Sequence, residues 1–467
     1  MTENGADAQS EGHTPASYMA LTFPQQPEPL YTVFQEYAIG SPACPHSNFL
    51  NGVLWSPDGS CLLTASDDNW LRIFDLPQDA LETPALGRTA VDGPLGPSSQ
   101  TDLSQVFVAQ EVAERLQGST DEAVLGALGS SNLQPSDSLS AALRMQEGET
   151  VYGMAWYPGM TAEDPASCCF ATTSRAHPIH LWDACSGGLR CSYRGYNDVD
   201  EVTAAFSVCF SPDGQHLLGG YNKSFAVFDV SRPGREYRKV TTFTKKRQEN
   251  LPGMISCMAF SPGSGEMLAA GSYSGSIALY DTRTWEMLYV LSGHKGGLTQ
   301  VQFTADGNFL LSGARQDSSL ICWDLRGGEA SGELYRMQRG TAKTNQRIQF
   351  DVEPCGRHVA TGGCNGCVKV FDLQTGDSVD EIRASLDTVN GCMFHPYLNL
   401  LSVATGQRRY PISVQDDLMS SEDEGAGGGA RTLQREAGFL PVELQGGMEN
   451  VLRVYRLKYE MMPCPQG

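Results

Sequence analysis

Long apolar segments are missing from this 467-residue sequence, which contains no run of 18 uncharged apolar residues. The first residues, MTENGADAQSEGH, contain neither a basic nor an apolar segment. We therefore expect neither a membrane span nor a secretory signal peptide. The fourteen cysteines are scattered through apolar runs instead of being spaced as a disulfide framework, so we expect a reducing, intracellular compartment.

Catalytic signatures are missing as well. The sequence has no G-x-S-x-G, no G-x-x-x-x-G-K-[ST] and no H-E-x-x-H, and its eight histidines do not cluster. The stretch CNGC places Cys364 and Cys367 at the spacing of a zinc knuckle, but no second pair of ligands follows. We interpret CNGC as a tight turn, and we expect no enzymatic activity, metal or cofactor.

Positive charge is scarce: 33 Lys and Arg stand against 54 Asp and Glu, which gives a net charge of −21. Residues 1–29, 77–149 and 411–449 carry −4, −8 and −6, that is −18 of this total. The remainder of the chain is close to neutral. The acidic total therefore does not exclude a basic binding face on the body of the protein.

One pattern recurs along the chain: an apolar run, a turn of the Ser-Pro-Asp-Gly type, a second apolar run, and a strand that ends in aromatic-Asp. Examples are VLWSPDGSCLLTASDDNWLRIFD at 53–75 and VQFTADGNFLLSGARQDSSLICWD at 301–324. The other copies occupy 154–183, 208–229, 258–281, 350–372 and, interrupted, 392–408 with 450–456. Successive aromatic-Asp ends from the second copy on lie 46, 52, 43 and 48 residues apart. Such a repeat predicts an all-β fold, a seven-bladed β-propeller.

We expect a disordered tail over 1–29 and a propeller over 30–467. Disordered acidic insertions are expected at 77–142, in or after the first blade, and at 409–449, in the seventh. The alternating segment PLYTVFQEYA precedes the first repeat and is expected to form the outer strand of the last blade, paired with VLRVYRLKY near the C-terminus. Such pairing closes the ring.

The fifth copy resembles the WD40 repeat. In that repeat a Gly-His before the first strand, a Ser or Thr on the second, an Asp in the next turn and a Trp on the third are linked by hydrogen bonds. His294, Ser312, Asp317 and Trp323 occupy these places, and we find no other complete set. We therefore assign His294 to the scaffold and not to catalysis. Phe49 is assigned to the core.

Basic residues recur in the loops that lead into first strands or join second to third strands, which lie on one face of a propeller. The candidate RNA-binding residues are Arg175, Lys223, Lys245, Lys246, Arg247, Lys295, Arg315, Lys343, Arg347 and Arg408. The tyrosines available for stacking on bases are Tyr196, Tyr221, Tyr273 and Tyr410. The alternative is that solvated loops are charged anyway and pair with nearby acids.

Long stretches of the chain resemble the telomerase Cajal body protein family, WD40 proteins that bind small Cajal body RNAs. They include NFLNGVLWSPDGSCLLTASDDNWLRIFDLP, LSGHKGGLTQVQF, FLLSGARQDSSLICWDLR and NGCMFHPYLNLLSVATGQR, and the resemblance covers 48–76 and 143–408. It implies an adaptor that recognises the Cajal body box of these RNAs and of telomerase RNA. Such an adaptor carries H/ACA ribonucleoproteins to Cajal bodies and supports telomerase trafficking and telomere maintenance.

The same resemblance implies partners and places in the cell. The partners are the telomerase reverse transcriptase complex, dyskerin, coilin, the survival of motor neuron protein and, for folding, the cytosolic chaperonin. The locations are the nucleus with its Cajal bodies, telomeres and in part the cytoplasm. By local alignment, family positions at which changes impair the protein correspond to Phe49, His294, Arg315 and Gly362. The alternative to this function is a protein scaffold without direct RNA contact.

Overall fold

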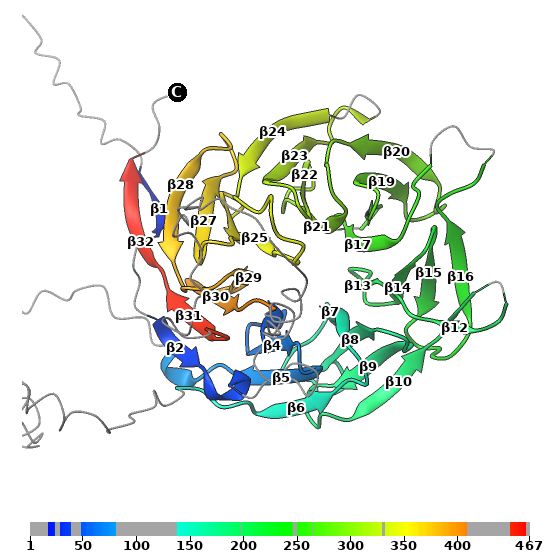
Figure 1. Ribbon diagram of the computed structural model, residues 1–467, viewed down its shortest axis with the longest axis horizontal. Helices are drawn as coiled ribbons and strands as arrows, with labels where there is room; N and C mark the ends of the chain where they lie inside the picture. Colours follow the sequence, from blue (N-terminus) through cyan, green and yellow to red (C-terminus); the bar gives the residue numbers. More distant parts are fainter. Residues whose placement is uncertain are drawn as a thin grey trace, which may run out of the picture. The chain divides into compact units, whose positions relative to one another are not determined.

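The computed structural model describes residues 17–23, 29–38, 48–80, 138–197, 199–245, 250–263, 265–328, 332–408 and 449–463. Within these ranges the strands form seven four-stranded antiparallel sheets arranged as blades around an axis (Figure 1). The predicted all-β, seven-bladed propeller is confirmed. The chain divides into two compact units, Met1–Leu76 with Asp137–Gly467 and Pro77–Ser136, and the first unit holds all seven blades.

Each blade runs from an inner strand beside the axis to an outer strand at the periphery. In this order blade 1 holds β3 (Leu50–Trp55), β4 (Cys61–Ser66), β5 (Trp70–Asp75) and β6 (Leu143–Gln146); blade 2 holds β7 (Val151–Trp156), β8 (Cys169–Ser174), β9 (Ile179–Asp183) and β10 (Leu189–Tyr193). Blade 3 holds β13 (Ser207–Phe210), β14 (His216–Tyr221), β15 (Ser224–Asp229) and β16 (Tyr237–Thr241); blade 4 holds β17 (Ile255–Phe260), β18 (Met267–Ser272), β19 (Ser276–Asp281) and β20 (Met287–Ser292).

Blade 5 holds β21 (Leu298–Phe303), β22 (Phe309–Ala314), β23 (Ser319–Asp324) and β24 (Gly332–Gln338); blade 6 holds β25 (Phe350–Val352), β26 (His358–Gly362), β27 (Cys367–Asp372) and β28 (Ser378–Arg383). Blade 7 holds β29 (Val389–Phe394), β30 (Leu400–Thr405), β31 (Leu452–Arg456) and β2 (Pro29–Val33). The remaining elements are the pairs β1 (Ser17–Thr22) with β32 (Lys458–Pro463) and β11 (Gly195–Tyr196) with β12 (Val202–Thr203), and two 3-10 turns, η1 (Gln35–Tyr37) and η2 (Gln78–Ala80).

The ring closes as the sequence predicts, because β2 pairs antiparallel with β31. A second closing pair was not predicted: β1 runs antiparallel to β32. The expectation of a disordered tail over 1–29 is therefore wrong for residues 17–22. Leu21 and Phe23 are buried in the core between blades 6 and 7, and the Phe23 ring lies 5.2 Å from that of His358. Their burial, together with strand pairing, favours order at this point.

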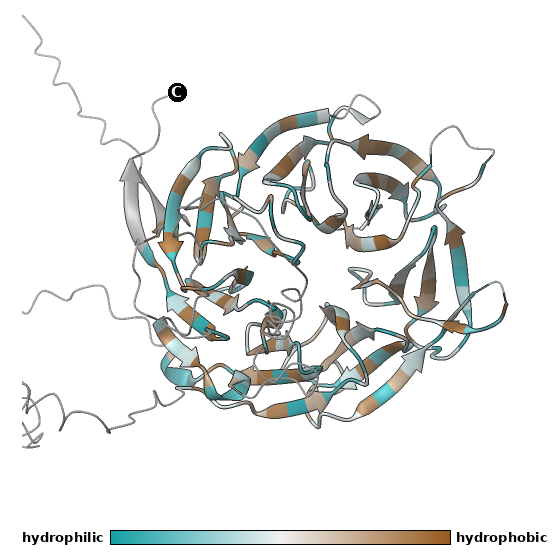
Figure 2. Ribbon diagram, in the orientation of Figure 1, coloured by the Kyte–Doolittle hydropathy of each residue, from teal (hydrophilic) through white to brown (hydrophobic). Residues whose placement is uncertain are grey.

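Each sheet is apolar on both faces, which is why the blades pack against one another. Between blades 4 and 5, for example, Ile277 and Leu279 pack with Leu310 and Ile321, and all four are fully buried. Burying a side chain of this size contributes about 1.5–3 kcal/mol. Figure 2 shows that hydrophobic residues follow the middle strands. In β6, β10 and β16 at the outer edge, hydrophobic and hydrophilic residues alternate.

The acidic insertions expected at 77–142 and 409–449 fall almost wholly outside the described residues. Within the described parts of the chain, no helix has the length and apolar character that a membrane span requires. No group of three or more His, Cys, Asp or Glu side chains in these parts is arranged to hold a metal ion. CNGC lies at the turn between β26 and β27, with Cys367 as the first residue of β27.

Candidate nucleic-acid interface

The predicted basic residues lie on one face of the propeller, which follows from the strand order. In an antiparallel blade the loop from the second to the third strand and the loop that leaves the fourth strand lie at the same end. We call this end the front face. The back face holds the other loops of each blade. On the front face, Lys223 lies between β14 and β15, and Lys295 lies between β20 and β21.

Six of the ten candidate RNA-binding residues are exposed on the front face: Arg175, Lys223, Lys245, Lys295, Lys343 and Arg408. The ammonium group of Lys223 lies 5.1 Å from the centroid of the Phe243 ring, a cation–π contact. Lys246 and Arg247, which were also predicted, lie outside the described residues.

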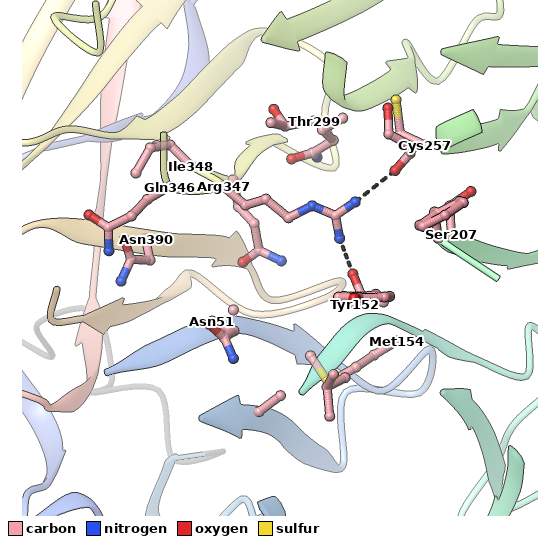
Figure 3. Close-up of a pocket in the computed structure, with 18 of the residues that line it drawn as sticks. Asn51, Tyr152, Met154, Ser207, Cys257, Thr299, Gln346, Arg347, Ile348 and Asn390 are labelled. Carbon is pink, nitrogen blue, oxygen red and sulfur yellow. Dashed lines mark hydrogen bonds between the residues drawn. The ribbon is translucent and has the colours of Figure 1, made fainter. Parts of the chain in front are cut away.

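Arg408 also lines a central cavity of about 820 Å³, together with Arg315 and Arg347, the two remaining candidates. Its walls come from the inner strands, from the loops that lead into them and from turns between second and third strands, and Figure 3 shows the part around Arg347. Besides these three arginines, the residues that line the cavity are uncharged, and no Asp or Glu is among them. The charged side chains that line the cavity are therefore all basic.

The structure places Arg347 differently from the prediction, because its guanidinium reaches into the cavity instead of lying on the rim. It donates hydrogen bonds to the carbonyl of Tyr152 on β7 and, at 2.7 Å, to the carbonyl of Ser256 at the inner edge of blade 4 (Figure 3). Burial lowers the pKa of Arg347 to about 10, and the nearby Arg315 contributes to the same shift. Arg347 thus links blades 2 and 4 and is a cross-brace.

Neighbours of Arg347 in the segment 345–349, the channel brace, tie further blades together. Gln349 Oε1 accepts the main-chain N–H of Val53 on β3 at 3.1 Å. Gln346 Nε2 donates to the carbonyl of Gly406 beside blade 7 at 3.3 Å. Asn345 offers its carbonyl to a guanidinium N–H of Arg315. Sequence spacing places Arg347 in a loop between two blades but does not show that this loop turns into the central cavity.

Replacing Arg347 with alanine is expected to lower the free energy of unfolding by about 2 kcal/mol, because two main-chain carbonyls lose a charged donor. Arg347→Lys, which keeps the positive charge but lacks the two-pronged guanidinium, should lose less. Lys343→Ala, an exposed neighbour in the same loop, is the control and should change stability by less than about 0.5 kcal/mol. Urea denaturation measures all three, and an unchanged midpoint for Arg347→Ala would rule out the brace.

Arg408 and Phe49 lie together where the seventh blade meets the first. Arg408 forms an ion pair with the carboxylate of Asp67, and its guanidinium carbon lies 5.6 Å from the centroid of the Phe49 ring. Phe49 is 8% exposed. The ring therefore belongs to the core, as expected, and the Arg408 guanidinium packs against it in a cation–π contact.

The four residues predicted to form a network in blade 5 are joined by hydrogen bonds. His294 Nδ1 lies 2.9 Å from Asp317 Oδ2, and His294 Nε2 lies 2.7 Å from Ser312 Oγ. Trp323 Nε1 donates to the same hydroxyl at 2.8 Å. Burial opposes ionisation of Asp317, but hydrogen bonds from His294 and two main-chain N–H groups outweigh it and hold the carboxyl pKa well below its usual value.

Blade 2 contains a related network that the sequence analysis missed. Trp182 Nε1 donates to Thr172 Oγ1 at 2.9 Å, as Trp323 does to Ser312. The carboxylate of Glu147, however, takes the place of the histidine, accepting from Ser174 Oγ at 3.0 Å and lying 3.0 Å from His180 Nδ1. Thr172 and Trp182 stand where Ser312 and Trp323 stand in blade 5, and this was the signal that could have revealed the network.

The candidate stacking tyrosines differ in exposure. Tyr221 is buried, and the guanidinium of Arg235 lies 4.7 Å from the centroid of the Tyr196 ring. Tyr273 is 44% exposed. Tyr410 lies outside the described residues. Of the described candidates, Tyr273 best retains a surface for a base.

Comparisons with known proteins place this propeller in a family. The family described as "WD domain, G-beta repeat" matches residues 43–75 and 285–324. Telomerase Cajal body protein 1 of Mus musculus is 37% identical over 431 residues, which are 91% of this chain and 69% of the mouse protein. The protein of the same name from Homo sapiens is 37% identical over 94% of this chain and 69% of its own length. This chain belongs to the telomerase Cajal body protein 1 family.

The fold of this family member also matches a solved structure. The β-propeller domain of Myceliophteria thermophila Cps50 (Swd1) superposes with a TM-score of 0.53, covering 77% of this chain and 94% of that domain at 14% identity. That likeness shows the shared propeller fold.

The four positions that the family resemblance singled out all have structural contacts in this family member. Phe49 lies in the core and His294 in the blade 5 network. Arg315 binds the channel brace through the carbonyl of Asn345. Gly362 ends β26, where a Cβ atom would come within 2.2 Å of the Val389 carbonyl oxygen. Phe49 and Gly362 are buried, and His294 and Arg315 are partly buried.

Proposed function

We propose that this chain is an RNA-binding adaptor that recognises the Cajal body box of small Cajal body RNAs and of telomerase RNA through its front face. The observation that carries the proposal is a difference between the two faces in how arginine and lysine are paired. On the back face, arginines pair with the aspartates that end third strands: Arg190 with Asp183, Arg232 with Asp229, Arg283 with Asp281, Arg326 with Asp324, and Arg357 with Asp372.

Five exposed basic residues of the front face, Arg175, Lys223, Lys245, Lys295 and Lys343, form no ion pair with any described residue, whereas Arg408 pairs with Asp67. Basic side chains without an acidic partner leave their positive charge available for phosphates, and release of counterions from the RNA then favours binding. The cavity at the centre of this face is lined by three arginines and no acid, which adds to the positive charge of this face.

The family supplies the identity of the proposed RNA. Its curated members are named for telomerase and the Cajal body, and the long shared motifs cover most of the propeller. We extend the proposal to delivery of H/ACA ribonucleoproteins to Cajal bodies and support of telomerase at telomeres. The partners are then the telomerase reverse transcriptase complex, dyskerin, coilin and the survival of motor neuron protein, with the cytosolic chaperonin assisting folding.

Removing positive charges from the front face tests the proposal. The triple variant Lys223→Ala, Lys295→Ala, Lys343→Ala should bind a Cajal body box hairpin about tenfold or more weakly at physiological salt. The slope of log affinity against log salt should fall by about 0.7 for each lysine removed. The matched control removes three back-face charges, Arg232, Arg283 and Arg326, and should bind as the wild type does. A folded triple variant with wild-type affinity and slope would argue against the front face.

A further inference from the structure

Two adjacent front-face turns place an exposed aromatic ring and an arginine at the mouth of the central cavity. Tyr273 lies in the turn between β18 and β19 of blade 4, and Arg315 lies in the corresponding turn of blade 5. Both line the cavity. Burial at this place lowers the pKa of the Arg315 guanidinium.

Gly297, which precedes the first strand of blade 5, contacts both residues. A Cβ atom at this position would lie 2.7 Å from the Tyr273 ring, so the ring rests directly on the main chain there. The main-chain N–H of Arg315 donates to the carbonyl of Gly297 at 2.8 Å. One face of the Tyr273 ring is thus covered by backbone, and the 44% exposure of the residue belongs to the remainder of the ring.

Arg315 has donors to spare. One N–H of its guanidinium binds the carbonyl of Asn345, and no other hydrogen bond from this side chain reaches a described residue. Burial lowers the pKa of Arg347, and repulsion from the nearby positive charge of Arg315 lowers it further. With no acid among the residues that line the cavity, an anion at Arg315 would relieve this repulsion.

We propose that Tyr273 and Arg315 form a nucleotide subsite, in which one unpaired base of the RNA loop stacks on Tyr273 and its phosphate accepts hydrogen bonds from Arg315. The subsite rests on the proposed RNA binding and specifies where one nucleotide of the loop is bound. Single-stranded RNA loops present bases that can leave the stack, and aromatic rings and guanidinium groups are the side chains that receive them. Stacking reads a π-face, so the subsite selects an unpaired position and not one particular base.

The test pairs a protein variant with single abasic positions in the RNA. The full chain is titrated with a Cajal body box hairpin and with hairpins in which each loop nucleotide in turn is abasic. The wild type should lose about tenfold in affinity at one loop position. Tyr273→Ala should lose about tenfold on the intact hairpin and nothing more at that position, while Tyr273→Trp should bind as the wild type does.

The matched control is Tyr397→Ala, because Tyr397 is 73% exposed but lies in the back-face loop between β29 and β30. It should reproduce the wild-type profile. Arg315→Lys tests the phosphate contact, with thermal denaturation to show that the variant is folded; a folded variant should bind the intact hairpin several-fold more weakly.

The outcomes separate the subsite from the proposed function. Wild-type affinity for Tyr273→Ala, or the same further loss at every abasic position, overturns the subsite while the effect of the lysine triple variant still supports the front face. A wild-type chain that does not bind the hairpin overturns both.

Discussion

Replacing His294 with alanine is expected to lower the free energy of unfolding by about 3–5 kcal/mol, the cost of leaving a buried charged group without its partner. Asp317 is 4% exposed and would lose its contact with His294 Nδ1, and Ser312, which is fully buried, would lose its contact with Nε2. Chemical denaturation of the purified chain measures the loss. The variant Trp323→Phe, which removes one neutral hydrogen bond, should lose only about 1 kcal/mol.

The same network predicts a dependence on pH. The pKa of Asp317 is lower in the folded chain than in the unfolded chain, so its ionisation stabilises the fold above the usual carboxyl range. This stability is lost as the pH falls through the depressed folded-state pKa. Without His294 the depression shrinks, so the difference in stability between wild type and His294→Ala should narrow in acid. A constant difference from neutral pH to acid pH would contradict the network.

Gly362→Val is the second change with a large expected effect, a loss of about 3 kcal/mol from overpacking. The added Cβ would lie 2.2 Å from the carbonyl oxygen of Val389, which is main chain at the start of β29 and cannot move without displacing the inner strand of blade 7. Gly332→Ala is the matched control, because nothing lies within 4 Å of its Cβ position and its φ is not positive. It should change stability by less than about 0.5 kcal/mol. Equal denaturation midpoints for the two variants would show that the inner strand yields.

Periodic features of this chain were predictable from the sequence because each blade repeats the same local physics. The turn glycines, the apolar strands and the aromatic-Asp ends recur, so the number of blades and the closing strand β2 followed from spacing alone. The hydrogen bonds of His294 followed from the same register. Six of the predicted basic residues lie exposed on the front face, because alternating connections decide which loops share an end.

Features that depend on long-range contacts were not predictable. Arg347 has the sequence context of a loop residue, yet it bridges Tyr152 and Ser256, which lie 195 and 91 residues away along the chain. Glu147 replaces a histidine in blade 2, so a search for Gly-His could not find its network. Leu21 lies in a segment with the composition of a tail, and only the core between blades 6 and 7 gives it a place to pack.

Direct contact between RNA and the front face is tested most directly by crosslinking. The full chain is bound to a hairpin with a Cajal body box, crosslinked by ultraviolet light through 4-thiouridine in the loop, and digested, and the crosslinked peptides are identified. We predict peptides from the front-face loops around Tyr273, Lys295 and Lys343. Crosslinks confined to the back face or to the outer strands, or no crosslink from a hairpin that binds only when a partner protein is added, would contradict direct recognition by the front face.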